Sequence, residues 1–238
     1  MNQEVIRIDL NGVNCYLGKV KEGFVLFDTG GNLTLDKKFN NRRQELVQKL
    51  EQEGCYPGSL KAIILTHGDI DHTMNAAYLR EQYQTIIIMH EGDIELVENL
   101  TIDKMLESFQ FKSLVLKLVF KLMKKPIRKL SEKSLNAYET FQPDTFLNEG
   151  DSLAQYGFNG KVIHLPGHTA GSIGILCENG ELIAGDTFTN MKKPSTALNA
   201  YNFKELRKCV KKLKDKQITK IYPGHGEPFQ ANLLGFIK

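Results

Sequence analysis

The amino-acid sequence predicts an α/β fold in which two β-rich halves form paired sheets with helices outside. Strand-like apolar runs alternate with segments of helical periodicity over most of the 238 residues, which is typical of α/β proteins. The alternation runs through the first hundred residues and resumes after about residue 138. At 238 residues the chain could form one large domain or two small ones, and the segment at about 101–138 interrupts the alternation.

The first half should contain five strands and three helices. Runs rich in β-branched and aromatic residues predict strands at 4–10, 14–20, 23–30, 61–66 and 85–90. Helical periodicity predicts helices at about 37–53, 72–82 and 91–100. In the first of these helices, Phe39, Leu46, Val47 and Leu50 share one face, which should pack on the sheet.

The second half repeats this theme. Strands are predicted at 160–167, 172–180, 181–188 and 220–226. The lysine-rich stretch 202–220 follows a helical pattern, with Phe203, Leu206, Val210 and Leu213 facing inward. Its lysines are interpreted as a solvated helix face. Nucleic-acid binding is disfavoured, because no RNA- or DNA-binding motif accompanies the charge.

The insertion is strongly basic and strongly apolar. The chain carries a net charge of +3, yet residues 112–133 alone hold eight Lys or Arg against one Glu. Lys117, Lys121, Lys124 and Arg128 form one narrow stripe, while the rest of the helix up to Pro126 is mostly apolar. The candidates to cover this wide face are the protein's own core, the partner subunit of a homodimer, an apolar substrate, or a membrane surface.

The bulk sequence predicts a cytoplasmic protein with reduced thiols. The first residues lack a basic region followed by an apolar core, and no window has the roughly 18 apolar residues of a membrane span. The four cysteines are scattered without CxxC spacing, which argues against a disulfide framework. They are Cys15, Cys55, Cys177 and Cys209.

Polar side chains crowd the end of one predicted strand. In "THGDIDH", His67, Asp69, Asp71 and His72 occupy six positions directly after an apolar run, where α/β folds tend to place their sites. A single histidine there would more often be structural, but two His and two Asp at this spacing indicate metal ligation.

Three further turns follow apolar strands in the same way. They are "LPGHTAGS" around His168, "IAGDTF" around Asp186 and "YPGHGEP" around His225. Each contains glycine and one metal-competent side chain.

The order and spacing of these motifs resemble the metallo-β-lactamase superfamily of metallohydrolases, whose pattern is H-x-H-x-D-H, then His, then Asp, then His. The resemblance covers nearly the whole chain, from "DTGGN" to "PGHGEP". It implies a single domain over residues 1–238 that forms a four-layer αββα sandwich with a helical insertion at about 101–138. The site is then expected at one edge of the two sheets.

The resemblance also implies a dinuclear metal site. His67 and His168 match ligands of a first metal, and Asp186 matches the carboxylate that bridges both. Asp71, His72 and His225 match the ligands of the second metal. Two divalent ions are thus expected, with zinc favoured and iron or manganese as alternatives.

Asp69 departs from the family, whose commonest residue there is histidine. A carboxylate is harder than imidazole and favours harder metals, although zinc accepts it as well. Asp69 is expected as a seventh ligand, the alternative being that it misses the metal.

Asp28 in "FDTGG" matches a position that supports the metal-binding loops, and it should hold a ligand histidine in its tautomer; a simple turn cap is the alternative.

Asp71 is the expected catalytic acid/base, shuttling a proton to the leaving group. His90 and His164 are interpreted as structural.

The resemblance implies a metal-dependent hydrolase that uses activated hydroxide on an ester, thioester, lactone or related bond of a small molecule, apolar molecules included. The glyoxalase-II branch is disfavoured, because only thirteen residues follow His225 and that branch has a helical domain there. The tyrosine of quorum-quenching lactonases is not matched in "DTFTNMKK". The alternatives are a diiron-type oxidoreductase, whose pattern H-x-E-x-D-H also has a carboxylate at the position of Asp69, and a phosphodiesterase or nuclease of the same fold.

The insertion is expected to form a lid. Long excursions within compact domains are commonly lids or binding elements. Residues Phe109 to Met123 are predicted to form a helix over or beside the metal cleft, with an apolar substrate wall. The wall residues are Phe111, Leu114, Val115, Leu118 and Leu122.

Overall fold

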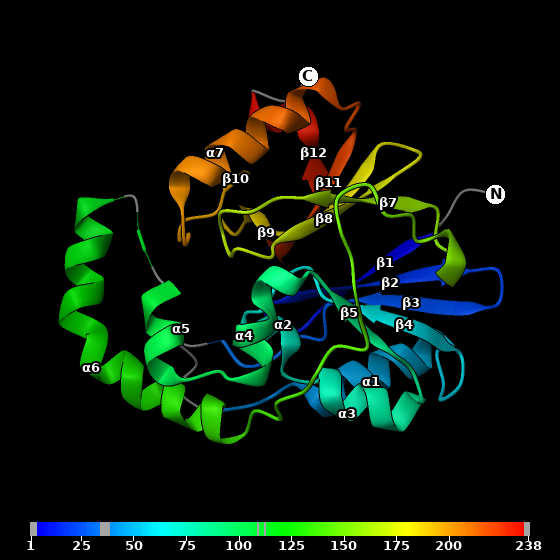
Figure 1. Ribbon diagram of the computed structural model, residues 1–238, viewed down its shortest axis with the longest axis horizontal. Helices are drawn as coiled ribbons and strands as arrows, with labels where there is room; N and C mark the ends of the chain where they lie inside the picture. The colour runs from blue at the N-terminus through cyan, green and yellow to red at the C-terminus, as the bar shows by residue number, and fades with distance from the viewer. Residues whose placement is uncertain (1–3, 34–38, 109, 112, 236–238) are drawn as a thin grey trace.

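The computed structural model describes residues 4–33, 39–108, 110–111 and 113–235, and it contains two six-stranded sheets packed face to face with helices outside (Figure 1). The first sheet has the order β1-β2-β3-β4-β5-β6. Its strands are β1 (Val5–Asp9), β2 (Asn14–Val20), β3 (Gly23–Phe27), β4 (Leu60–Ile64), β5 (Ile87–Met89) and β6 (Thr145–Phe146). The pairing is antiparallel up to β3 and parallel from β3 to β6.

The second sheet has the order β12-β11-β9-β8-β7, with β10 also paired to β9. Its strands are β7 (Gly160–His164), β8 (Ile173–Cys177), β9 (Glu181–Asn190), β10 (Ser195–Thr196), β11 (Lys220–Gly226) and β12 (Phe229–Gln230). Only β9 and β11 run parallel. Their parallel pairing brings Asp186 and His225 close together, because Pro223 pairs with Gly185 and His225 with Thr189, on either side of Asp186 in β9.

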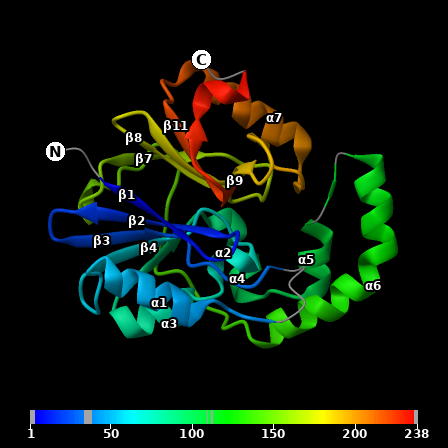
Figure 2. The ribbon, with the colours of Figure 1, turned by 180° about the vertical axis from the view of Figure 1, so that it is seen from behind.

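The α-helices are α1 (Arg43–Gln52), α2 (Ile70–Thr73), α3 (Ala76–Tyr83), α4 (Ile94–Glu98), α5 (Ile102–Ser108), α6 (Leu114–Asn136) and α7 (Phe203–Lys212). Short 3₁₀ turns lie at Glu91–Asp93, Ala154–Tyr156, Leu213–Asp215 and Ala231–Leu234. Figures 1 and 2 show α1 and α3 outside the first sheet and α7 outside the second. The layers are therefore αββα, as the sequence predicts.

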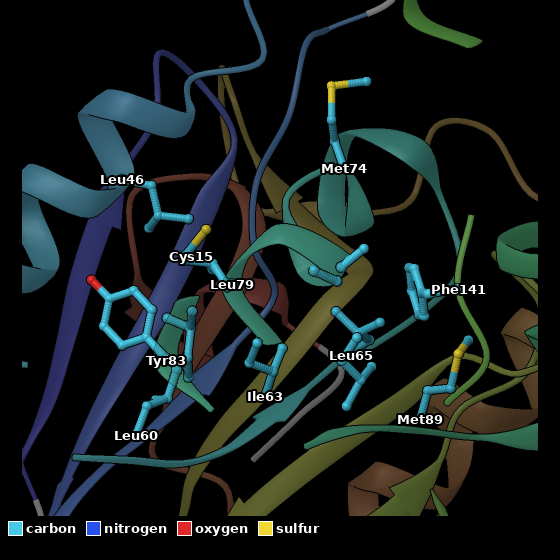
Figure 3. Close-up of a cluster of buried hydrophobic side chains, with 14 of the residues drawn as sticks. Cys15, Leu46, Leu60, Ile63, Leu65, Met74, Leu79, Tyr83, Met89 and Phe141 are labelled. Carbon is cyan, nitrogen blue, oxygen red and sulfur yellow. The ribbon is translucent and has the colours of Figure 1, made fainter. Parts of the chain in front are cut away.

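Three apolar clusters hold these layers together. One lies between α1, α3 and the first sheet and includes Leu46, Leu79 and Ile63 (Figure 3). A second joins α7 to the other sheet through Leu206 and Val210. The third fills the space between the two sheets, where inward residues of both sheets meet. This alternation of side chains across each strand is what the period-2 pattern of the strands predicts.

Several predicted boundaries change. The helix expected at 37–53 begins at Arg43, because the side chains of Asn40 and Asn41 accept the backbone N–H groups of Arg42 and Arg43 and form turns there; residues 34–38 lie outside the described residues. The helix expected at 72–82 is divided into α2 and α3. Strands β6, β10 and β12 are short additions that the sequence does not signal.

The insertion forms α5 and α6, and α6 continues through Pro126 instead of ending there. Proline removes one helical hydrogen bond, but the following turns are anchored by buried Ile127, Ser131 and Ser134. Phe109, the expected start of this helix, lies outside the described residues, and α6 begins at Leu114. None of the described helices combines the length and apolarity that crossing a membrane requires.

All four cysteines are free and buried. This agrees with the expectation of reduced, buried thiols.

Candidate metal centre

Two loops, helix α2 and the strands β9 and β11 bring the seven predicted ligand side chains together. His67 and Asp69 lie in the loop after β4, and Asp71 and His72 lie in α2. The other three come from the loop after β7 and from strands β9 and β11: His168, Asp186 and His225. In both ribbon views, α2 lies beside the end of β9 (Figures 1 and 2).

Three groups of three described side chains lie close enough to hold a metal ion, and two of them consist only of predicted ligands; the third combines Asp28 with His67 and His72. In the first group, Oδ2 of Asp69 lies 3.1 Å from Nε2 of His168 and 3.9 Å from Nε2 of His67. Asp69 thus faces the same space as the two histidines. Its position is compatible with a ligand rather than with a residue that points away.

In the second group, Oδ2 of Asp71 lies 3.9 Å from Nε2 of His72 and 3.6 Å from Nε2 of His225. All three side chains are mostly enclosed, and the His72 side chain is fully buried. A carboxylate and two imidazoles at these separations form a donor set typical of zinc and of other transition metals.

Asp186 lies between the two groups. Its Oδ2 atom is 3.1 Å from Nε2 of His225 and 3.6 Å from Nε2 of His168, and its Oδ1 atom is 3.4 Å from Nε2 of His72. It therefore reaches histidines of both groups. Gly224 makes room for it, since a Cβ atom at that position would collide with Asp186 Oδ1.

All four histidines present Nε2 to the centre because their Nδ1 atoms are held elsewhere. His72 Nδ1 lies 3.0 Å from Asp28 Oδ2, and His67 Nδ1 lies 2.9 Å from Thr66 Oγ1. The Nδ1 atom of His168 lies 3.2 Å from the carbonyl oxygen of Asn199, and that of His225 lies 2.7 Å from the carbonyl oxygen of Gly12. Such contacts fix the ring orientation and the tautomer of a metal-binding histidine.

Asp28 organises the loop as well as the ring of His72. Its carboxylate accepts hydrogen bonds from the backbone N–H of Thr66 (2.7 Å) and from the Thr66 hydroxyl (2.8 Å). Asp28 adopts a left-handed backbone conformation, with φ of 59°, which aspartate tolerates better than most residues. The contacts to His72 and Thr66 extend beyond the alternative of a simple turn cap.

The polar atoms left over at the centre fit a cation. Among the described residues, the buried atoms His67 Nε2, His72 Nε2 and Asp186 Oδ1 form no hydrogen bond. Leaving buried polar atoms unpaired costs on the order of 1–3 kcal/mol each. Divalent metal ions would satisfy these lone pairs and offset the charges of the clustered carboxylates.

The electrostatics of the cluster are strongly coupled. Burial lowers the pKa of His67 to about 4. Burial also acts to lower the pKa of His168, but the hydrogen bond and charge of Asp69 outweigh it and raise that pKa to about 9. Burial raises the pKa of Asp71 above its ordinary value, which suits a carboxyl group that exchanges protons.

Asp93 is a further site-supporting residue that sequence reasoning misses. It is buried, and its Oδ2 atom accepts hydrogen bonds from Gly68 N (2.8 Å) and Thr169 Oγ1 (2.6 Å). Its Oδ1 atom accepts from Gly171 N at 2.6 Å. Asp93 thereby joins the loop of His67 to the loop of His168. An acidic residue in a short helical turn gives no signal of this in the sequence.

The centre opens into a cleft of about 270 Å³. The lining residues are Leu33, Asp69, Asp71, Asp186, Thr189, Met191, Ala197, Leu198, Asn199 and His225. The expected apolar wall from the insertion is therefore not part of this lining. The apolar residues of α6 are exposed instead, because only the second half of the helix is anchored to the body of the protein.

His90 and His164 lie outside the metal cluster. Their rings stack on each other, with centroids 4.1 Å apart and an interplanar angle of 11°. His164 Nε2 lies 3.0 Å from the carbonyl oxygen of Ala170, and Nδ1 of His90 accepts a hydrogen bond from Gly92 N. These contacts agree with a structural role for both.

The chain is similar to known proteins in both its sequence and its fold. The family model described as the metallo-beta-lactamase superfamily matches residues 8–225. A curated relative from Haemophilus influenzae, hydroxyacylglutathione hydrolase GloC, is 28% identical over 178 residues, which are 74% of this chain. The match spans 66% of that relative's length.

A probable metallo-hydrolase of Methanocaldococcus jannaschii, MJ0888, is 29% identical over 201 residues, covering 82% of this chain and 83% of the relative. Among solved structures, a family protein of Thermus thermophilus, TTHA1429, matches with a TM-score of 0.70 at 21% identity, over 99% of this chain and 76% of that one. TTHA1623, solved in a di-iron-bound form, matches with a TM-score of 0.65 at 24% identity, over 97% and 96% of the two chains.

Proposed function

This chain belongs to the metallo-beta-lactamase superfamily, and on that basis we propose that it is a metal-dependent hydrolase acting on an ester, thioester, lactone or related bond of a small molecule. The observation that carries the proposal is the position of Asp186, whose carboxylate reaches histidines of both groups. A carboxylate shared between the two groups supports a dinuclear centre, because its two oxygens can serve two cations at once.

The residues divide into three roles. His67, Asp69 and His168 would hold one divalent ion, while Asp71, His72 and His225 would hold the second. Asp186 would bridge the two, and Asp28 would orient His72. Bound there, the two ions would lower the pKa of a water toward neutrality and polarise the substrate oxygen.

The protein's own contribution to the reaction is proton transfer and positioning. Asp71 borders the cleft and has a raised pKa caused first by burial, so its carboxylate can take a proton from the attacking water and pass it to the leaving group. Backbone and side-chain contacts to each Nδ1 keep the imidazoles fixed during this step. Less reorganisation is then needed as the reaction proceeds.

The residues that line the cleft and the names of the relatives support the proposed substrate classes. Leu33, Met191 and Leu198 give the cleft an apolar rim, which favours an acyl or other apolar group. The relative named hydroxyacylglutathione hydrolase supports including thioesters. Zinc is the favoured metal, with iron and manganese as alternatives.

A panel of ester, thioester, lactone and phosphodiester substrates tests the proposal. Protein loaded with zinc, iron or manganese should hydrolyse at least one carboxylic substrate class and lose that activity after chelation. Restoration by the metal but not by magnesium would support transition-metal ligation by histidine. Hydrolysis that persists at the full rate in metal-free protein would contradict the proposal.

An oxidoreductase of the diiron type is the second candidate, and the carboxylate of Asp69 beside His67 and His168 favours it. The di-iron-bound form of TTHA1623 adds support for iron as a metal. Oxygen consumption by the iron-loaded protein with an electron donor, in the absence of any hydrolysis, would favour this candidate over the hydrolase.

A further inference from the structure

The first half of α6 is exposed on nearly all sides. From Leu114 to Pro126, every residue except Phe120 is exposed, and the Phe120 ring lies 5.2 Å from that of Phe111. The exposed fraction reaches 81% for Leu114 and 73% for Leu122. The other large apolar residues that are exposed here are Val115, Leu116, Leu118, Val119 and Met123. A contiguous exposed apolar patch of this kind marks an interaction surface.

The apolar side chains gather on the side of α6 that faces away from the protein. At about 100° per residue, one half of the helix carries Leu114, Val115, Leu118, Val119, Leu122 and Met123. The opposite side holds the buried anchors Ile127, Ser131 and Ser134, and Arg128 binds Asp103 at 2.6 Å. Figures 1 and 2 show α6 at the periphery, beyond α5.

Basic residues border this apolar side. Helix α6 contains seven Lys or Arg and one Glu, a net charge of +6. In the described part of the chain, Lys117 and Lys121 form no ion pair. A helix with an apolar face and lysines beside it is the pattern of helices that lie in the headgroup region of a membrane.

The positive charge of α6 favours an anionic lipid surface over a second copy of the chain as the partner that covers its apolar side. A second copy packed on this face would bring a +6 helix against its like, with no acidic residue between Leu114 and Ser131 to compensate. An anionic lipid surface complements the lysines and buries the leucines at the same time.

The apolar surface continues to the mouth of the metal cleft. Phe111 forms a β-bridge with Asn199, and Ala200 N donates a hydrogen bond to Gln110 O at 3.0 Å. Around this junction Met191, Leu198 and Tyr201 are also exposed. Since Leu198 and Asn199 line the cleft, a surface that covers α6 would lie close to the cleft mouth.

We propose that the first half of α6 lies in the surface of an anionic lipid bilayer and holds the protein there as a peripheral membrane protein, with the mouth of the metal cleft near the lipid. The proposal rests on α6 and its charges, and it holds whether or not the centre performs hydrolysis.

Vesicle co-sedimentation of the metal-loaded protein tests the proposal. The protein should bind vesicles of phosphatidylcholine mixed with phosphatidylglycerol and bind pure phosphatidylcholine much more weakly. Added salt should weaken the binding, because screening reduces the lysine contribution. The double variants Leu118→Gln/Leu122→Gln and Lys117→Gln/Lys121→Gln should each bind at least about tenfold more weakly.

Matched variants at other exposed positions control for nonspecific effects. Leu233→Gln removes an exposed leucine, and Lys211→Gln/Lys212→Gln removes two exposed lysines of α7; both should bind as the unaltered protein does. Unchanged melting temperatures would show that the α6 variants remain folded. Absence of vesicle binding, or equal binding by all variants, would overturn the proposal.

Light scattering measures the oligomeric state and so distinguishes membrane binding from dimerisation as the role of the exposed half of α6. A dimer that does not bind vesicles and becomes monomeric in Leu118→Gln/Leu122→Gln would also overturn the proposal. Hydrolysis of a small water-soluble substrate is measured in the same preparations. If vesicle binding behaves as stated while no preparation hydrolyses any substrate, the proposed function fails and the membrane assignment stands.

Discussion

Oδ2 of Asp69 lies 3.1 Å from Nε2 of His168, at the position where the family pattern most often has a histidine. Burial acts to raise the pKa of Asp69, but the hydrogen bond and charge of His168, together with the charge of His67, outweigh burial and hold that pKa below its ordinary value. The carboxylate is therefore ionised at neutral pH. As a ligand beside two imidazoles, this anionic oxygen would make the site harder than a purely histidine site.

We predict that Asp69→His shifts the metal content toward zinc and away from iron and manganese. Metal analysis of protein purified without added metal, followed by competition between zinc and manganese, measures this shift. Asp215→His, at an exposed position, is the matched control. An unchanged metal ratio in Asp69→His would remove Asp69 from the proposed ligands.

Asp93 should stabilise both metal-binding loops. In Asp93→Asn, an amide N–H₂ group replaces one acceptor and faces backbone or hydroxyl donors. The loss of these buried hydrogen bonds should lower the free energy of unfolding by about 1–3 kcal/mol and weaken metal retention. Denaturant unfolding with Asp215→Asn as control measures the effect; equal stability of the two variants would contradict it.

The sequence predicts the candidate ligand residues, but it does not predict the residues that hydrogen-bond to them and to their loops. Polar side chains just after apolar runs predict that His67, Asp71, His168 and His225 gather near strand ends, and the structure brings them together, although Asp71 lies in α2 and His225 lies within β11. The contacts of Asp93 and of the Asn199 carbonyl depend on loops about 75 and 30 residues away. No local periodicity encodes such contacts.

The same distinction holds for the fold. Strand and helix periodicity predicts the four layers, because it specifies which side of each element is apolar. It does not specify whether an apolar side will be covered. For α6 the pattern predicts the helix, yet Leu118 and Leu122 are exposed and do not line the metal cleft. The side chains of Asn40 and Asn41 form turns just before α1 and so compete with helix formation there, an effect that periodicity does not detect.

The His90–His164 stack should make stability depend on pH. Burial, and next the charge of His164, lowers the pKa of His90 below its ordinary value of 6.5. The unfolded chain then takes up the proton first as the pH falls, so this contribution to stability is present above about pH 6.5 and is lost at lower pH.

We predict that the free energy of unfolding falls less steeply from about pH 7 to about pH 5 in His90→Asn than in the unaltered protein. Asparagine keeps an acceptor for Gly92 N, which His90 Nδ1 now serves. Comparing slopes between the two proteins cancels the titration of the metal centre. Parallel slopes would exclude this role of the histidine pair.

Asp186→Asn should abolish hydrolysis and lower the metal content to one ion or fewer per chain. A neutral amide is a poor bridge between two cations, and the charge that offsets them is lost. Activity and metal content are measured on the same sample. Full metal occupancy with undiminished turnover would show that Asp186 does not bridge.

Anomalous diffraction from crystals of protein purified without added metal tests the dinuclear centre most directly. The account predicts two metal peaks, with ligand distances of about 2.0–2.2 Å for nitrogen and oxygen. One peak should be bound by His67, Asp69 and His168, the other by Asp71, His72 and His225, and both by Asp186. A single peak, or two peaks that share no contact with Asp186, would contradict the central claim.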